Sequence, residues 1–237
     1  MVWPPGYDIA SNYDEMVSAD GTPRPGCIDV VKRLDHLGPE LFERQAAAEA
    51  AIRSMGVTFT LYDDGRAVDR AWPVDVIPRI ITIEEWNRVS PGLIQRLTAL
   101  NRFTDDLYHD REVVRDGVVP EDLVLDAPNF RSECIGVSPT GGIWAHICGS
   151  DLVRDDTGKF FVLEDNLRIP SGVSYMLENR QVTKRVLADL FRDLDILPVD
   201  GYTQQLGARL RALSPRPLDE PVVVVLTPGI HNSAYYE

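Results

Sequence analysis

The sequence of 237 residues contains little cysteine. Cys27, Cys134 and Cys148 form no CxxC pair and have no histidine at the spacing of a zinc site, so neither a structural zinc site nor a disulfide scaffold is supported. If a hairpin joins the segments around Cys134 and Cys148, their sulfurs could face each other. Two reduced, buried thiols are the stronger expectation, and they favour a cytoplasmic protein.

Long apolar runs and positive charge are also scarce. The longest apolar run is residues 222–226, and the start of the chain lacks the basic and apolar regions of a signal peptide. A formal net charge of −13 opposes nonspecific binding to nucleic acid or to an anionic membrane. We therefore expect neither partner, whereas a nucleotide can still bind if a metal ion brings the compensating charge.

The remaining composition is that of a soluble globular protein, with 44% hydrophobic and 26% charged residues. Residues 1–26 are rich in proline and glycine without apolar periodicity, and we expect an extended arm that packs on the rest. Residues 27–215 are expected to form the main body. The run at 222–226 is typical of a strand buried on both faces, so residues 216–237 are expected to begin a second α/β domain that is cut short.

The periodicity predicts both helices and strands in the main body. Helices are expected at 40–55 after Pro39, at 83–108 with an interruption at Pro91, at 173–194 and at 202–213. Thr82 and Glu85 form a capping box, and Leu93, Leu97, Leu100, Phe103 and Leu107 make an apolar stripe. Strands are expected at 57–62, in a partner after the turn at 63–65, and in short runs at 113, 123–125, 135–137, 144–148, 152–154 and 160–164.

The most informative stretch is residues 149–172, which predicts a hairpin. With a two-residue loop at Thr157 and Gly158, Asp151 lies directly opposite Glu164. Asn166 shares their face because it is two residues beyond Glu164, while Asp165 points away. Two opposed carboxylates repel each other unless a cation lies between them.

The hairpin therefore suggests a Mg²⁺ site made by Asp151, Glu164 and Asn166. Arg168 could hold a phosphate or a developing oxyanion, and Ser171 and Gly172 could offer donors at the start of the next helix. The alternative is a solvated acidic hairpin, which is common, and spacing alone does not choose between the two.

Longer phrases of the sequence resemble a known family. Residues 151–170 are similar to the metal-binding hairpin of ATP-grasp enzymes such as D-alanine–D-alanine ligase. The phrases YDEMV (13–17), DVIPRII (75–81), LEDNLRIPSGVSYMLENR (163–180) and VVLTPGIHNSAYYE (224–237) resemble the circularly permuted type 2 ATP-grasp family, which is related to glutathionylspermidine synthase. The resemblance covers nearly the whole chain.

The resemblance implies a fold and a set of ligands. It implies an ATP-grasp-type antiparallel sheet with flanking helices, an α/β (α+β) fold, followed by the first strand of a truncated Rossmann-like domain. Asp151, Glu164 and Asn166 would bind Mg²⁺, and Arg168 would lie near the ATP phosphates or an acyl-phosphate intermediate. The lysines and Gly-rich loop that clamp ATP in the family have no counterpart here.

Other candidate residues have a weaker basis. Glu178, Asn179 and Arg180 could line a substrate site, but a solvated helix face explains them equally well. His146 is expected to be a structural histidine with its hydrogen bonds satisfied, and Asp116 with Gly117 a tight turn. His231 and Asn232 follow the predicted strand where α/β folds gather ligands.

Two functions follow from the sequence. The first is an ATP- and Mg²⁺-dependent carboxylate–amine ligase that joins a small-molecule or peptide carboxylate to an amine through an acyl phosphate. The second is a noncatalytic binding or assembly module that retains the fold. In either case the exposed edge at 222–226, with Tyr235 and Tyr236, predicts self-association or a missing C-terminal half that covers it.

Overall fold

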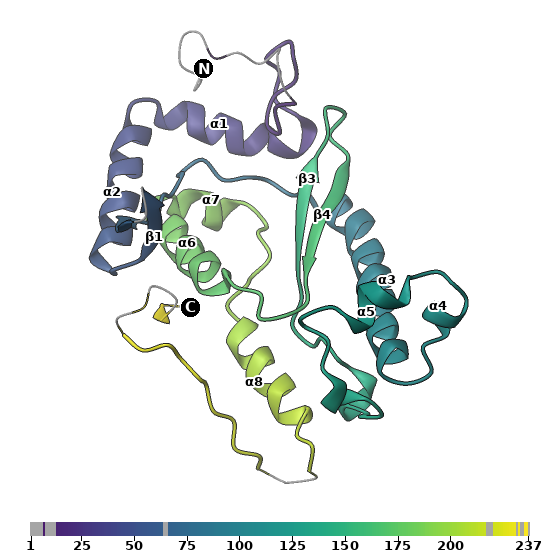
Figure 1. The fold of residues 1–237 in the computed structure, drawn as a ribbon. Helices are drawn as coiled ribbons and strands as arrows, with labels where there is room; N and C mark the ends of the chain where they lie inside the picture. The colour runs from purple at the N-terminus through teal and green to yellow at the C-terminus, as the bar shows by residue number, and fades with distance from the viewer. Residues whose placement is uncertain are drawn as a thin grey trace.

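The computed structural model describes residues 7, 13–63, 66–216, 220–230, 232, 235 and 236. Helices carry most of the regular structure, and two antiparallel hairpins form separate two-stranded sheets within the described part (Figure 1). The elements are α1 (Ile28–Leu37), α2 (Glu40–Ser54), β1 (Thr58–Asp63), β2 (Arg66–Ala71), α3 (Ile83–Tyr108), α4 (Glu112–Arg115), α5 (Glu121–Leu125), β3 (Gly149–Arg154), β4 (Phe160–Asn166), α6 (Val173–Val186), α7 (Ala188–Asp193) and α8 (Tyr202–Ala212).

The buried core lies between the N-terminal helices and the pair α6 and α7. Ala48 and Ile52 of α2 pack with Val182 of α6 and Leu190 of α7 in the larger cluster. A smaller cluster joins the N-terminal arm to α1 through residues that include Met16, Val17 and Leu34. The arm therefore gains its order by packing on the body, as expected for its described residues.

The helices predicted at 40–55, 83–108 and 202–213 form as α2, α3 and α8, whereas the one predicted at 173–194 is divided at Leu187 into α6 and α7. The Thr82 hydroxyl accepts from the Glu85 N–H at 3.2 Å, and the Glu85 carboxylate accepts from the Thr82 N–H at 2.9 Å, so the capping box forms. Gly56 ends the helix α2 at φ +68°, a conformation that favours glycine. Within the described residues, no helix combines the length and hydropathy that a membrane crossing requires.

One detail of the helix predictions is wrong, and two of the helices leave apolar side chains exposed or half-buried. Pro91 does not interrupt α3, because Pro91 and Asn87, whose carbonyl loses its usual donor, are both exposed and water can replace the missing bond. Phe42 is 80% exposed because it faces away from the α2 surface that carries Ala48 and Ile52. The α3 stripe is only half-buried, since no residue of this helix is fully buried.

The strands predicted between residues 112 and 148 are also wrong. This part of the chain forms α4, α5 and two short 3₁₀ turns at Ser132–Cys134 and Thr140–Gly142. It packs along α3, where Trp144 donates from its backbone N–H to Asn101 Oδ1 at 2.8 Å and from Nε1 to Asp105 Oδ1 at 2.8 Å. No hairpin therefore pairs Cys134 with Cys148, and all three cysteines are free.

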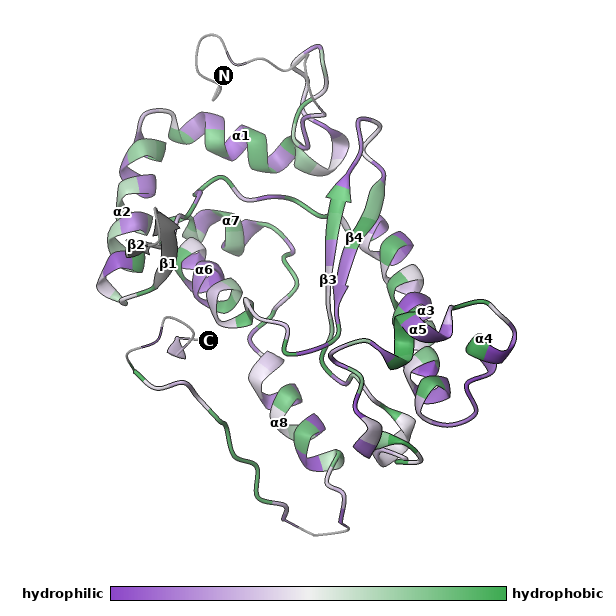
Figure 2. Cartoon of the chain, viewed as in Figure 1, coloured by the Kyte–Doolittle hydropathy of each residue, from purple (hydrophilic) through white to green (hydrophobic). Residues whose placement is uncertain are grey.

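The C-terminal run at 222–226 is extended but forms no strand. Val222 and Leu226 are 89% and 95% exposed, because no described strand lies beside them to supply ladder partners. Figure 2 shows this apolar segment as a line of green along the outer edge of the molecule. Tyr235 is half exposed, whereas Tyr236 packs on Tyr175 with ring centroids 5.1 Å apart, so the predicted exposure holds for the first and not the second.

Candidate metal centre

The hairpin of β3 and β4 places Asp151 directly opposite Glu164, as predicted. The predicted two-residue loop is wrong, however, because Arg154 pairs with Phe160 and five residues lie between them. That odd loop alone would place Asp151 opposite Leu163. A β-bulge between the Asp151 and Leu152 pairs adds one residue on β4 and restores the Asp151–Glu164 pair.

The bulge also changes which side chains face outward. Leu163 and Glu164 are both exposed, although consecutive residues of a regular strand point to opposite faces. If β4 alternated regularly through Leu163, Glu164 would point to the inner face. The bulge is therefore what turns Glu164 and Asn166 to the same outer face as Asp151.

The inner face of the hairpin is held by α3. The Asp165 carboxylate accepts from Ser150 Oγ at 2.7 Å and forms an ion pair with Arg96 of α3. Burial by itself raises the pKa of Asp165, but the Ser150 hydrogen bond and the Arg96 guanidinium outweigh it and hold this pKa below its usual value. Asp165 is thus a structural carboxylate, and it points away from the outer face as predicted.

The outer face carries the three predicted ligands, all exposed. Asn166 Nδ2 donates to Glu164 Oε1 at 3.1 Å, which confirms that the two share a face. This bond uses the amide nitrogen, so Asn166 Oδ1 is left as an acceptor on the face that also carries Glu164 and Asp151. Two carboxylates and one amide oxygen are hard ligands of the kind that Mg²⁺ takes, so the donor set fits the ion.

The donor set also fits an ion that takes its remaining ligands from water and from a substrate. Among the described residues, no three His, Cys, Asp or Glu side chains gather closely enough to hold a metal by themselves. Asp151 and Glu164 are two such side chains, and Asn166 is the third ligand. Mg²⁺ commonly binds one or two carboxylates and fills its octahedron with water and substrate phosphates.

The segment after β4 brings Arg168 near this face without fixing its side chain. Arg168 is exposed and forms no hydrogen bond or ion pair with the described residues. Ile169 has φ +48° and is 82% exposed, which is strained for a β-branched residue. Ser171 is exposed, and Gly172 precedes α6 at φ +108°. Phosphate binding by these residues stays a prediction.

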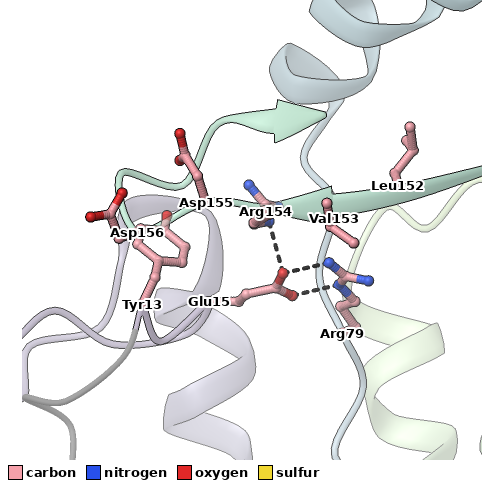
Figure 3. A pocket seen from close by; sticks show the side chains of 8 residues that line it. All are labelled: Tyr13, Glu15, Arg79, Leu152, Val153, Arg154, Asp155 and Asp156. Atoms are coloured by element: carbon pink, nitrogen blue, oxygen red, sulfur yellow. Dashed lines mark hydrogen bonds and ion pairs between the residues drawn. The ribbon is translucent and has the colours of Figure 1, made fainter. Parts of the chain in front are cut away.

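An ion-pair cluster that was not predicted from the sequence lies against the hairpin (Figure 3). Arg154 is 7% exposed, and it donates to Glu15 at 2.8 Å and to Glu85 at 2.7 Å. Burial by itself raises the pKa of Glu85. The hydrogen bonds from Arg154 and Thr82 lower it by more than burial raises it, so this pKa lies below its usual range. The sequence contained one signal for this cluster. Arg154 falls at an inward position of an alternating strand, and a buried charge needs partners.

The weaker candidates gain little support. Arg180 donates to the Leu197 carbonyl at 3.2 Å, and the buried Asn179 Oδ1 has no hydrogen-bond partner among the residues that the structure describes. His146 is exposed and makes no hydrogen bond with the described residues, so the expectation of a satisfied structural histidine is wrong.

Of the candidates in turns and at the C-terminus, one is confirmed. Asp116 and Gly117 form the expected turn after α4, with Gly117 at φ +69°. His231 lies outside the described residues. Asn232 donates its backbone N–H to the Gly229 carbonyl at 3.0 Å.

Comparison with known proteins places this hairpin in a family context. The chain is 50% identical to an uncharacterized protein of Synechocystis sp. over 98% of its own length and 48% of that protein. It is 41% identical to an uncharacterized protein of Mycobacterium tuberculosis, covering 98% of the chain and 42% of the relative. The chain thus spans about half, or less, of the length of these curated relatives.

A third relative has a functional name. The chain is 39% identical over 96% of its length to a protein of Frankia casuarinae named "Putative glutamate–cysteine ligase 2-2", of which it covers 26%. The family model described as circularly permuted ATP-grasp type 2 matches residues 78–237, which include the whole β3–β4 hairpin. The chain therefore belongs to the circularly permuted ATP-grasp type 2 family.

Proposed function

We propose that this chain carries the metal-binding part of an ATP- and Mg²⁺-dependent carboxylate–amine ligase. The observation that carries the proposal is the single outward face on which Asp151, Glu164 and Asn166 meet in a chain of the ATP-grasp family. Ligases of this kind join a carboxylate to an amine through an acyl phosphate. The substrates would be a small-molecule or peptide carboxylate and an amine.

The residues of the outer face have distinct roles in this proposal. Asp151, Glu164 and Asn166 Oδ1 would hold Mg²⁺, which neutralises charge on the phosphates of ATP during phosphoryl transfer. The unpaired Arg168 guanidinium, two residues past Asn166 on the same chain, would hold a phosphate or stabilise a developing oxyanion. Ser171 and Gly172 would contribute hydrogen-bond donors at the start of α6.

The longer relatives support a larger catalytic unit. Because the chain spans 48% of the Synechocystis relative, the proposal includes a C-terminal part that supplies the ATP-clamping groups and covers 222–226 as a strand of a Rossmann-like domain. The name of the Frankia relative supports ligase chemistry only in general terms, since the chain covers 26% of that relative. We propose a cytoplasmic location on the basis of the cysteine usage.

The test measures Mg²⁺-dependent ADP release by the full-length protein with panels of carboxylates and amines. Asp151→Asn and Glu164→Gln should each lower the rate by about 100-fold or more, because each removes a ligand of the ion that neutralises the phosphates. Asp156→Asn is the matched control, since Asp156 is an exposed carboxylate in the turn of the same hairpin. Unchanged rates in both ligand variants would refute the site, and no ADP release from any substrate pair would favour a noncatalytic module.

A further inference from the structure

Two of the phrases that carry the family resemblance contain no proposed metal ligand, yet the structure brings both to the hairpin. Glu15 belongs to YDEMV (13–17), and Arg79 belongs to DVIPRII (75–81). The Glu15 carboxylate accepts two hydrogen bonds from the Arg79 guanidinium, each at 2.5 Å. The N-terminal arm and the segment before α3 are therefore joined by a bidentate ion pair.

Glu15 also binds the hairpin itself. Its Oε1 accepts from Arg154 Nε at 2.8 Å, while Arg154 Nη1 donates to Glu85 Oε1 at 2.7 Å and to the Gly158 carbonyl at 3.1 Å. The Arg154 guanidinium also lies over the Phe160 ring, 3.9 Å from its centroid. Two carboxylates and two guanidinium groups thus form a neutral cluster around a side chain that is 7% exposed.

A second contact fixes the turn of the hairpin independently of these charges. The Tyr13 ring lies so close to Gly158 that a Cβ at this position would be 2.4 Å from ring atoms. Gly158 also has φ +83°, which favours glycine. Tyr13 and Glu15 of the arm line an open hollow of about 480 Å³ together with the end of β3. Figure 3 shows how these side chains lie.

The hairpin needs such contacts because it pairs with no other strand in the described part of the chain. A two-stranded hairpin is marginally stable alone, so its twist and tilt depend on what its inner face contacts. Asp151 is three residues before Arg154 on β3 and faces the other way. A shift of Arg154 would therefore move Asp151 relative to Glu164.

We propose that residues 13–17 form a latch that holds the hairpin in the geometry required for metal binding, with Glu15, Arg79 and Arg154 as positioning residues. Its effect on the metal rests on the proposed function, whereas the latch itself does not. Arg154 lies on the opposite face of β3 from Asp151 and is not one of the proposed ligands. The latch thus explains why the two remote phrases accompany the metal hairpin.

The experiment compares the unsubstituted chain with Glu15→Gln, Arg154→Lys and a matched control, Asp193→Asn. The control breaks the Arg33–Asp193 ion pair, whose side chains are about as exposed as Glu15 and which contacts α1 rather than the hairpin. Hydrogen exchange of the β3 and β4 amides measures the latch. A Mg²⁺ titration followed by the amide chemical shifts of the same strands measures the metal site.

We expect roughly tenfold faster exchange in both latch variants, because the hairpin opens locally more often, with no change in the control. We also expect severalfold weaker Mg²⁺ binding at an unchanged thermal midpoint, which a merely structural loss would not produce. Unchanged exchange in both latch variants overturns the latch, and faster exchange with unchanged Mg²⁺ affinity overturns the positioning role. If Mg²⁺ moves no hairpin amide of the unsubstituted chain, the proposed metal site fails, and the exchange rates alone decide the latch.

Discussion

At the scale of single residues, Ile169 combines a strained backbone with a side chain that packs on almost nothing. Left-handed φ values cost an L-residue free energy, and the following Pro170 restricts Ile169 further. Exposure of 82% means that little apolar burial offsets the strain. Strain of this kind is tolerated where it directs a functional group, and the neighbouring side chain is Arg168.

We therefore predict that Ile169→Gly stabilises the protein while it lowers activity. The free energy of unfolding should rise by about 0.5–1 kcal/mol, since glycine removes the strain but gains freedom in the unfolded chain. ADP release by the full-length protein should fall because glycine lets the backbone next to Arg168 adopt more conformations. Urea denaturation and the kinetic assay measure the two effects, and a variant that loses stability would show that no strain is stored at this position.

A second residue-scale prediction concerns acid. The pKa values of Asp165 and Glu85 lie below their usual range, so the folded state binds protons less readily than the unfolded chain. Their contribution to stability is fully present above the unfolded pKa values of about 4 and is lost as the pH falls through the folded values. The thermal midpoint should fall steeply below about pH 4, and Asp165→Asn should flatten part of that decline. An identical pH dependence in this variant would contradict the assignment.

At the scale of elements, the bulge in β4 allows the register of the hairpin to be tested by single-residue deletions, which point substitutions cannot do. Deleting Leu163 should leave a regular strand in which Asp151 still faces Glu164, because Leu163 is the extra residue. Deleting Val153 instead should turn Asp151 to the inner face. Mg²⁺-induced chemical shifts in the two deletions measure the outcome, and Mg²⁺ binding by the Val153 deletion alone would show that the register described here is wrong.

The same hairpin shows which structural features could be predicted from the sequence and which could not. The prediction of the Asp151–Glu164 pair holds only because the β-bulge, which no local pattern indicated, offsets the error in the predicted loop length. The capping box at Thr82 and Glu85 was predictable because its signal is local. The run at 123–125 was misread as a strand, since a short apolar run fits a strand and one turn of a helix equally well, and it lies in α5. The latch residue Arg154 depends on partners far away in the sequence, which no local pattern contains.

At the scale of the whole molecule, the chain exposes more surface than its mass requires. Its accessible surface is 16,744 Å², whereas a compact monomer of 26.5 kDa exposes about 10,700 Å². The exposed segment 222–226 is part of this excess. Such surface is normally covered by another part of a protein or by another chain.

The corresponding prediction is self-association of the isolated chain through 222–226. Sedimentation should show oligomers at high concentration, and the double substitution Val224→Asp and Leu226→Lys should shift them toward monomers, because charge opposes the burial of an apolar edge. Phe42→Lys on α2 is the control, since Phe42 is equally apolar and 80% exposed. A monodisperse monomer with slow amide exchange across 222–226 would refute the prediction.

The latch also has a consequence for the order in which the protein becomes structured during synthesis. The Glu15–Arg154 ion pair joins residues 139 positions apart, so the arm leaves the ribosome long before its partner exists. Closing so long a loop costs entropy that only the finished contacts repay. Residues 13–17 are therefore made well before they are fixed, and the hairpin acquires its final geometry only when this arm returns to it.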